Sequence, residues 1–238
     1  MAMGRSLPGE MEPLAAVHRL YVLGWSNAEA WKEAGQWSPP QLYPAGTELL
    51  REGMWAEAVY LIEQGLVKLS CSGPDHGPLI LGLSAPGGLL GPNSALLQRP
   101  LAHTAETLTD CHASHMTAER FRYWVKTNSQ FSWRFHQVQS SERQRLMMQR
   151  VAVKCLSARR RLEQFLWEFA SLAGSSDPAK PIRLHIPLKR DELAGLIAIT
   201  RQHLGRLVNE LERDGLLRRH KGWWYINDLQ RLWHLSEV

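Results

Sequence analysis

Residues 188–212 contain two short helical patterns that meet at a tight turn, and this feature constrains the fold more than any other in the chain. Apolar side chains recur at helical spacing on both sides of the turn, so two helices can bury their inner faces against each other. The apolar positions are Leu193, Ala194, Ile197, Ile199, Leu204, Leu207, Val208 and Leu211. Thr200 precedes the second pattern where an N-cap side chain would accept from a free backbone amide. The segment predicts a helix-turn-helix.

The second helix carries polar side chains on its outward face from its first turn onward. Arg201, Gln202 and His203 follow the cap, and Arg206 lies one turn further along. The N-terminal half of such a helix is the part that enters the major groove of DNA. Arg can pair with guanine O6 and N7 through two hydrogen bonds, while Gln suits adenine N6 and N7. We therefore expect Thr200, Arg201, Gln202, His203 and Arg206 to face the bases.

A basic hairpin follows the two helices, with its turn at Lys221 and Gly222. A helix face with ordinary solvated charges does not explain this hairpin, whereas a wing that contacts backbone phosphates does. The charge balance agrees, because residues 155–238 carry 14 Lys and Arg against 10 Asp and Glu and so hold most of the net charge of +5. The expected phosphate contacts are Lys189, Arg190, Arg218, Arg219 and Lys221.

The first half of the chain has a different period. After two short helical patterns at residues 14–21 and 28–34, apolar or alternating runs are separated by Gly- and Pro-rich turns. These runs cover residues 58–62, 66–70, 79–83 and 105–115. Several short strands at close spacing predict an antiparallel roll.

Thr117 precedes a stretch without Pro or Gly that extends to Gly174. It predicts a short helix over residues 118–126 and a long one over residues 129–154, about 39 Å long at a rise of 1.5 Å per residue. The apolar positions of the long helix form a narrow stripe, interrupted at Ser141 and Glu142; they are Phe131, Phe135, Val138, Leu146 and Val153. Pairing with a second copy explains such a helix best. Packing against its own roll alone is the alternative.

The predicted fold class is therefore α+β, in four parts. A helical lead-in covers residues 1–35, and an antiparallel β-roll covers residues 36–127 as the sensor domain. A dimerisation helix covers residues 128–154, and a winged helix-turn-helix domain for DNA binding covers residues 155–238.

This order of parts resembles the CRP/FNR family of bacterial transcription factors, named for the cyclic-AMP receptor protein and the fumarate-nitrate reduction regulator. The strongest local match is Thr200, Arg201, Gln202, His203, Leu204, Gly205 and Arg206, which is similar to the family's Ser-Arg-Glu-Thr-Val-Gly-Arg. The resemblance implies a homodimer that binds a pseudo-palindromic operator in double-stranded DNA and works with RNA polymerase. Two residues depart from the family pattern. Gln202 replaces an acidic residue, and Ala198 lies where the family often has Gly, although a non-Gly residue with positive φ is uncommon.

The resemblance also implies an effector pocket with a cyclic-nucleotide-binding-like fold. In relatives that bind cyclic nucleotide, a Gly-Glu-Leu stretch and a downstream Arg-Ser-Ala hold the ribose and the phosphate. Here Pro92 replaces the carboxylate and His103 replaces the arginine, and a neutral imidazole cannot make a bidentate contact. We therefore expect no response to cyclic AMP. The expected pocket comprises Gly91, Asn93, Ser94, His103, Thr104, Val138, Ser141 and Glu142.

The cofactor, if any, stays unknown at this stage. Residues 1–40 contain no Cys, against the iron–sulfur version of the family. A haem-linked sensor, a small apolar or aromatic effector, and no effector at all stay open. Cys111, His112 and His115, with His103 nearby, come closest to a metal-ligand set. A strand turns Cys111 and His115 to one face and His112 to the other, so no metal site is assigned.

Several other classes of protein lack support in the sequence. No apolar run approaches the roughly 18 residues of a membrane span, and the first residues do not have the pattern expected of a signal peptide. Cys71, Cys111 and Cys155 are isolated, so we expect reduced thiols and a cytoplasmic location. No nucleophile elbow, P-loop or dinucleotide fingerprint indicates an enzyme. Two other classes of protein are the alternatives to a DNA-binding regulator: an enzyme, and a regulatory subunit whose winged helix contacts protein. Neither predicts the steep salt dependence of DNA binding.

Overall fold

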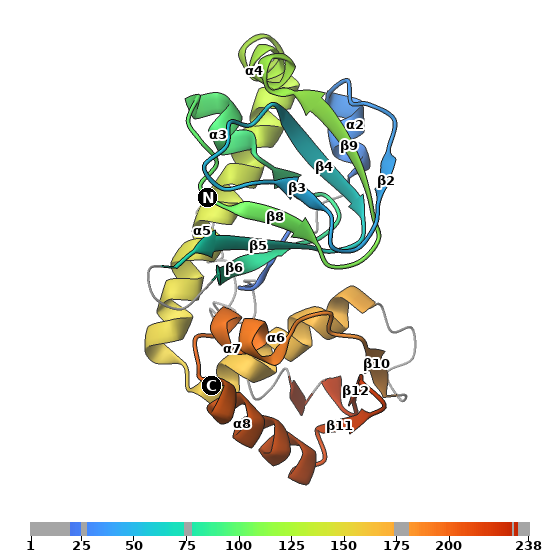
Figure 1. Cartoon of the computed structure of the whole chain (residues 1–238), viewed down its shortest axis with the longest axis vertical. Helices are drawn as coiled ribbons and strands as arrows, with labels where there is room; N and C mark the ends of the chain where they lie inside the picture. The colour runs from blue at the N-terminus through green and yellow to red at the C-terminus, as the bar shows by residue number, and fades with distance from the viewer. Residues whose placement is uncertain (1–19, 25–27, 74–77, 174–180, 230, 233–238) are drawn as a thin grey trace, which may run out of the picture.

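The computed structural model describes residues 20–24, 28–73, 78–173, 181–229 and 231–232. A β-rich unit and a smaller helical unit lie one above the other, and the long helix α5 (Ser129–Cys155) runs along the first and down to the second (Figure 1). Both predicted halves of the fold are confirmed.

The β-rich unit is a roll of two sheets. Its strands are β1 (Val22–Leu23), β2 (Gln41–Tyr43), β3 (Glu48–Leu50), β4 (Ala58–Gln64), β5 (Val67–Ser72), β6 (Pro78–Ser84), β7 (Leu89–Leu90), β8 (Thr104–Thr107) and β9 (Cys111–Thr117). The sheet orders are β1-β6-β5-β8-β3 and β2-β9-β4-β7. All pairs are antiparallel except β1 with β6. The predicted single run over residues 105–115 is two strands in different sheets, because the chain bends at residues 108–109 and Leu108 donates to Leu66 O there.

The lead-in differs from its prediction. Most of the first helical pattern lies outside the described residues, and its last residue, Tyr21, lies in a bend directly before β1 and is not helical. Tyr21 is buried, and its carbonyl oxygen accepts from Leu83 N at 2.9 Å, so edge pairing with β6 overrides the local helical pattern. The second pattern forms α2 (Glu29–Ala34) as expected.

The short helix before α5 begins at its predicted cap. After α3 (Pro92–Leu97), α4 (Ala118–Thr127) is capped by Thr117, whose side chain accepts from Arg120 N. The apolar stripe of α5 needs a correction. Phe131 and Phe135 are buried in a cluster with Trp31 and Phe121 of the same chain, so the first half of the stripe packs on its own roll. The rest of α5 is more open: Met147 is 61% exposed.

The smaller unit contains α6 (Ala158–Ala173), β10 (Ile182–Leu184), α7 (Arg190–Leu196), α8 (Arg201–Arg213), β11 (Leu217–His220) and β12 (Trp223–Ile226). The three strands form one sheet in the order β10-β12-β11. The buried faces of α6, α7 and α8 share one core, whose members include Leu162, Phe165, Leu193, Leu204 and Leu207.

Within the described part of the chain, no helix is both long and apolar enough to cross a membrane.

Candidate nucleic-acid interface and effector cavity

The candidate recognition surface is the N-terminal half of α8. Thr200 caps the helix, since its hydroxyl oxygen accepts from His203 N at 3.2 Å. Arg201, Gln202 and Arg206 are exposed and His203 is half-buried, while the apolar positions of the helix are buried. Arg201 lies 3.4 Å from Asp191 in an exposed pair, which is worth little in solvent and leaves the guanidinium free to exchange partners. The predicted base-reading side chains therefore share one accessible face.

The turn before α8 contains a residue other than glycine with a positive φ, which is uncommon. Ala198 has a φ of +56°, in the left-handed region that favours glycine. The amides of Ala198 and Ile199 donate to Gly195 O and Ala194 O. The buried Arg161 of α6 donates to the carbonyl oxygens of Ile197 and Ala198, at 2.8 and 3.2 Å. Arg161 is the last of three consecutive arginines, and nothing in the sequence distinguishes it as the one that binds the turn.

The predicted phosphate contacts divide into two groups. Lys189, Arg190, Arg218 and Lys221 are exposed as expected. Arg219 is different: its side chain donates twice to Glu212, at 2.6 and 3.0 Å, and once to Asn209 at 3.0 Å. The hydrogen bond from Arg219 also lowers the pKa of Glu212. Arg219 therefore fastens the wing to α8, and this disfavours the phosphate contact that we expected of it.

Aromatic rings support the wing. The turn of the hairpin places Lys221 and Gly222 at φ of +47° and +80°. The guanidinium of Arg218 lies 4.8 Å from the ring centre of Tyr225, and that of Arg183 lies 3.6 Å from the ring centre of Trp223. Arg183, on β10, was not among the sequence candidates. Stacking holds both cations on the hairpin, where they add to its positive charge.

A cavity of about 1120 Å³ lies between the roll and α5. Of the expected pocket residues, the cavity is lined by Gly91, Asn93, Ser94, His103, Val138, Ser141 and Glu142. Thr104 is not among the lining residues, because its hydroxyl faces the β3 side and accepts from Glu52 N. Burial lowers the pKa of His103, so its imidazole is neutral near pH 7.

The cavity wall is apolar with an excess of positive charge. Leucines from the roll and from α5 supply most of the apolar surface; they are Leu23, Leu69, Leu81, Leu89, Leu97, Leu101 and Leu146. Five arginines line the same space, namely Arg99, Arg134, Arg143, Arg145 and Arg150. Among the described lining residues, Glu142 is the one carboxylate, and Arg145 pairs with it at 3.2 Å. Two buried lining atoms, Ser84 Oγ and Arg134 Nε, have no hydrogen-bond partner in the described part of the chain.

The Cys and His residues of β9 are separated. Cys111 is buried and its thiol donates to backbone carbonyls, which include that of Thr109. His115 Nδ1 lies 3.1 Å from Ser38 Oγ. In the parts of the chain that the structure describes, no three His, Cys, Asp or Glu side chains gather closely enough to hold a metal ion.

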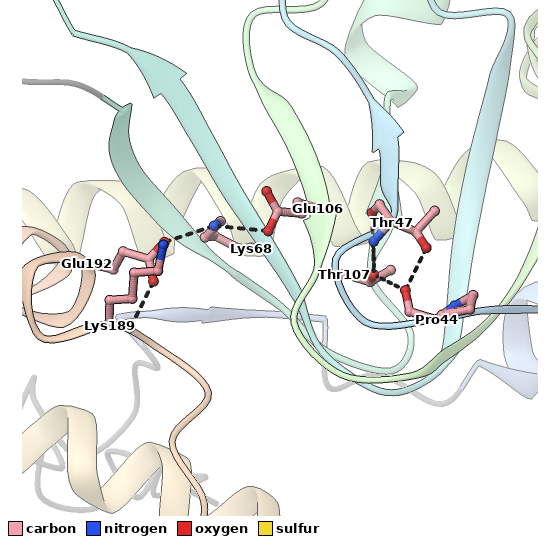
Figure 2. A network of polar contacts seen from close by, with 7 residues as sticks. All are labelled: Pro44, Thr47, Lys68, Glu106, Thr107, Lys189 and Glu192. Carbon is pink, nitrogen blue, oxygen red and sulfur yellow. Dashed lines mark hydrogen bonds and ion pairs between the residues drawn. The ribbon is translucent and has the colours of Figure 1, made fainter.

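A salt bridge joins the two units, as Figure 2 shows. Lys68 of β5 lies 2.9 Å from Glu192 of α7 and 3.3 Å from Glu106 of β8. Burial alone would raise the pKa of Glu192, but the hydrogen bonds from Lys68 and from Lys189 N, together with the charges of both lysines, outweigh it and hold the pKa below its usual range. Glu192 also accepts from Lys189 N at the start of α7. The first helix of the helix-turn-helix is therefore docked on the roll, against β6.

Comparisons with known proteins agree with this architecture. Residues 40–128 match the family model of the cyclic nucleotide-binding domain, and residues 160–235 match that of the Crp-like helix-turn-helix domain. The chain is 23% identical to the cAMP-activated global transcriptional regulator CRP of Escherichia coli O6:H1, over 75% of this chain and 84% of the relative. FixK2 from Bradyrhizobium japonicum superposes with a TM-score of 0.72 at 17% identity, over 85% of this chain and 98% of FixK2. A CooA variant from Carboxydothermus hydrogenoformans superposes with a TM-score of 0.66 at 20% identity, over 92% of this chain and 100% of the CooA chain.

A cyclic-nucleotide-binding-like roll joined by a long helix to a winged helix-turn-helix defines a class of DNA-binding transcription regulators. The chain belongs to the CRP/FNR family of that class.

Proposed function

We propose that the protein is a homodimer that binds a pseudo-palindromic DNA operator and responds to an anionic effector other than cyclic AMP. The observation that carries the DNA part is the single accessible face of α8, where Arg201, Gln202 and Arg206 are exposed beside a cationic wing. Arginines at these positions suit guanine edges, and the wing cations suit phosphates.

The exposed part of α5 supports the homodimer. Met147 and Val151 are 61% and 45% exposed, and they follow Ser140 and Gln144 along one face at alternating spacings of three and four residues. That spacing is the one by which two helices pack side by side. Two copies paired through this face would present two α8 helices to successive turns of one DNA duplex.

The wall of the cavity supports an anionic effector with an apolar body. Five arginines against one carboxylate favour negative charge, and the leucines favour apolar surface. Arg134 Nε and Ser84 Oγ are donors that such a ligand could satisfy. Cyclic AMP is disfavoured, since Pro92 and the neutral His103 line the cavity, and the family resemblance matches them to the carboxylate and the arginine that hold the ribose and the phosphate in relatives.

Binding of the protein to random-sequence duplex, measured by fluorescence anisotropy at several salt concentrations, tests the DNA part. Each phosphate neutralised adds roughly 0.9 to the slope of log affinity against log salt, so several contacts give a steep decline. Lys221→Ala should make the slope shallower by about one. Binding that does not change with salt would contradict the proposal.

A further inference from the structure

Residues 20–24 form a short segment that contacts the roll, α5 and α6. On the roll side, Leu83 N donates to Tyr21 O at 2.9 Å and Ala85 N donates to Leu23 O at 2.8 Å. Gly24 has a φ of +89°, and a Cβ there would lie 2.5 Å from Ala85 O. The segment is therefore seated closely against the edge of the roll, and only glycine fits at its end.

The same segment is held by α6 of the DNA-binding unit. The carboxylate of Glu168, which is fully buried, accepts from Leu20 N at 2.7 Å and from Tyr21 N at 2.9 Å. Gln164 Nε2 donates to it as well, at 2.9 Å. The ring of Tyr21 packs edge-on against Phe165, with centroids 5.9 Å apart. These contacts join residues about 147 positions apart in the sequence.

The third contact comes from α5 and reaches the cavity. Arg145, which is 8% exposed, donates from Nη1 to Leu20 O at 2.6 Å and pairs through Nε with Glu142 at 3.2 Å. Glu142 in turn accepts from the backbone of Gly24. Arg145, Glu142 and Gly24 all line the cavity.

Both backbone polar groups of Leu20 are thus held, each by a different helix. Its N–H is bound by Glu168 of α6 and its carbonyl by Arg145 of α5. Loss of either partner leaves the backbone group that it bound unsatisfied, which is costly, so both contacts together stabilise the position of the segment between α5 and α6. A contiguous set of such contacts can couple two sites if it has two arrangements that both sites bias.

We propose that residues 20–24 act as a clasp that couples the effector cavity to the DNA-binding unit. An anionic ligand in the cavity offers Arg145 an alternative acceptor to Glu142 and Leu20. Withdrawal of Arg145 releases Leu20 O, loosens the hold of Glu168 on the segment, and frees α6 from the roll. This inference rests on the proposed function only in that the cavity takes an anion.

Hydrogen exchange of the full-length protein, followed by mass spectrometry, tests the clasp without DNA or effector. Arg145→Met removes the hydrogen bond to Leu20 O and the ion pair with Glu142. Glu142→Gln removes the charge of the carboxylate that pairs with Arg145 in the cavity wall. We expect both variants to speed exchange at residues 20–24 and in α6 by about tenfold, because local opening sets exchange rates. Arg150→Met removes an equal charge from an exposed lining position of the same helix and should stay within about twofold of the wild type.

Faster exchange confined to residues 20–24, with α6 unchanged, would overturn the proposal, because the segment would then be a local edge strand only. If Arg145→Met fails to fold, Arg145→Lys keeps the charge while losing the guanidinium fork and should speed exchange to a smaller extent. DNA affinity is measured separately on the wild type. A wild type that binds no duplex would refute the proposed function and leave the exchange result to decide the clasp.

Discussion

Arg161 on α6 donates from Nε to the carbonyl oxygen of Ile197, 2.8 Å away in the turn between α7 and α8. Its other nitrogens reach Ala198 O at 3.2 Å and Leu156 O at 2.7 Å. One buried side chain therefore fixes the helix-turn-helix turn to the junction of α5 and α6. It also satisfies the carbonyls around Ala198, whose left-handed backbone would cost about 1–2 kcal/mol in isolation.

Replacing this arginine should destabilise the DNA-binding unit. Arg161→Met keeps much of the aliphatic volume but leaves the carbonyl oxygens of Ile197, Ala198, Leu156 and Val153 without this donor. We expect a loss of about 1–3 kcal/mol in the free energy of unfolding, measured by urea denaturation. Arg150→Met, at an exposed site, is the control and should change stability by less than about 0.5 kcal/mol. Equal effects of the two changes would show that Arg161 does not hold the turn.

The buried carboxyl of Glu168 makes stability depend on pH. Burial raises its pKa from 4.5 to about 7, against the opposing hydrogen bonds of Leu20, Gln164 and Tyr21 and the charge of Arg145. Between these two values the folded chain keeps a proton that the unfolded chain releases. The stabilisation is therefore complete below about pH 4.5 and is lost as the pH rises to about 7, with a slope of at most about 1.4 kcal/mol per pH unit.

Glu168→Gln keeps one carbonyl acceptor and removes the titration. As the pH rises from about 4.5 to about 7, the wild type should lose stability relative to Glu168→Gln. Above about pH 7 the difference in free energy of unfolding between the two should stay constant. A difference that stays constant between pH 4.5 and 7 would contradict the raised pKa.

The exposed face of α5 makes a prediction about assembly. Met147→Asp or Val151→Asp should weaken dimerisation at least about tenfold and leave the roll folded, because both side chains are exposed within one chain. Phe135→Asp should instead unfold the roll, since Phe135 is buried against Phe121. Light scattering at micromolar concentration gives the oligomeric state of each. A monomeric wild type would contradict the dimer.

The cavity can be tested with two dyes of nearly equal apolar shape. Anilinonaphthalene sulfonate carries a negative charge, and N-phenylnaphthylamine lacks it. One charge-assisted hydrogen bond is worth about 1.5–3 kcal/mol, so the anionic dye should bind about tenfold more tightly or better. Arg134→Gln should remove much of that preference, and calorimetry with cyclic AMP should show no binding. Equal affinities for the two dyes would contradict an anion site.

Short-range patterns predicted much of the fold. Thr117 and Thr200 could be identified as caps because a cap acts within three residues of itself, and both accept from the expected amide. The face to which a long helix turns its apolar stripe depends on distant partners. The sequence alone therefore favours a dimer interface for Phe131 and Phe135, whereas in the fold both rings pack against Trp31 and Phe121 of the same chain.

Part of the candidate site could also be predicted from local sequence patterns. The outward residues of α8 follow from helical spacing alone. Arg219 lies in an exposed-looking hairpin, and its pairing with Glu212 could be found only once the wing was folded back on α8. Arg145, Glu168 and Leu20 gave no signal, because their contacts span more than 120 positions and no local period records them.

A selection from random duplexes, with wild type and Gln202→Glu side by side, tests whether the outward face of α8 reads bases. If Gln202 faces a base, the wild type prefers an A·T pair at one position of each half-site, and Gln202→Glu shifts that position toward C·G, since a carboxylate accepts from the cytosine amine. Arg201→Ala or Arg206→Ala should relax one base pair at a cost of about 1–3 kcal/mol. Identical sequence preferences for wild type and Gln202→Glu would contradict the placement of α8 in the groove.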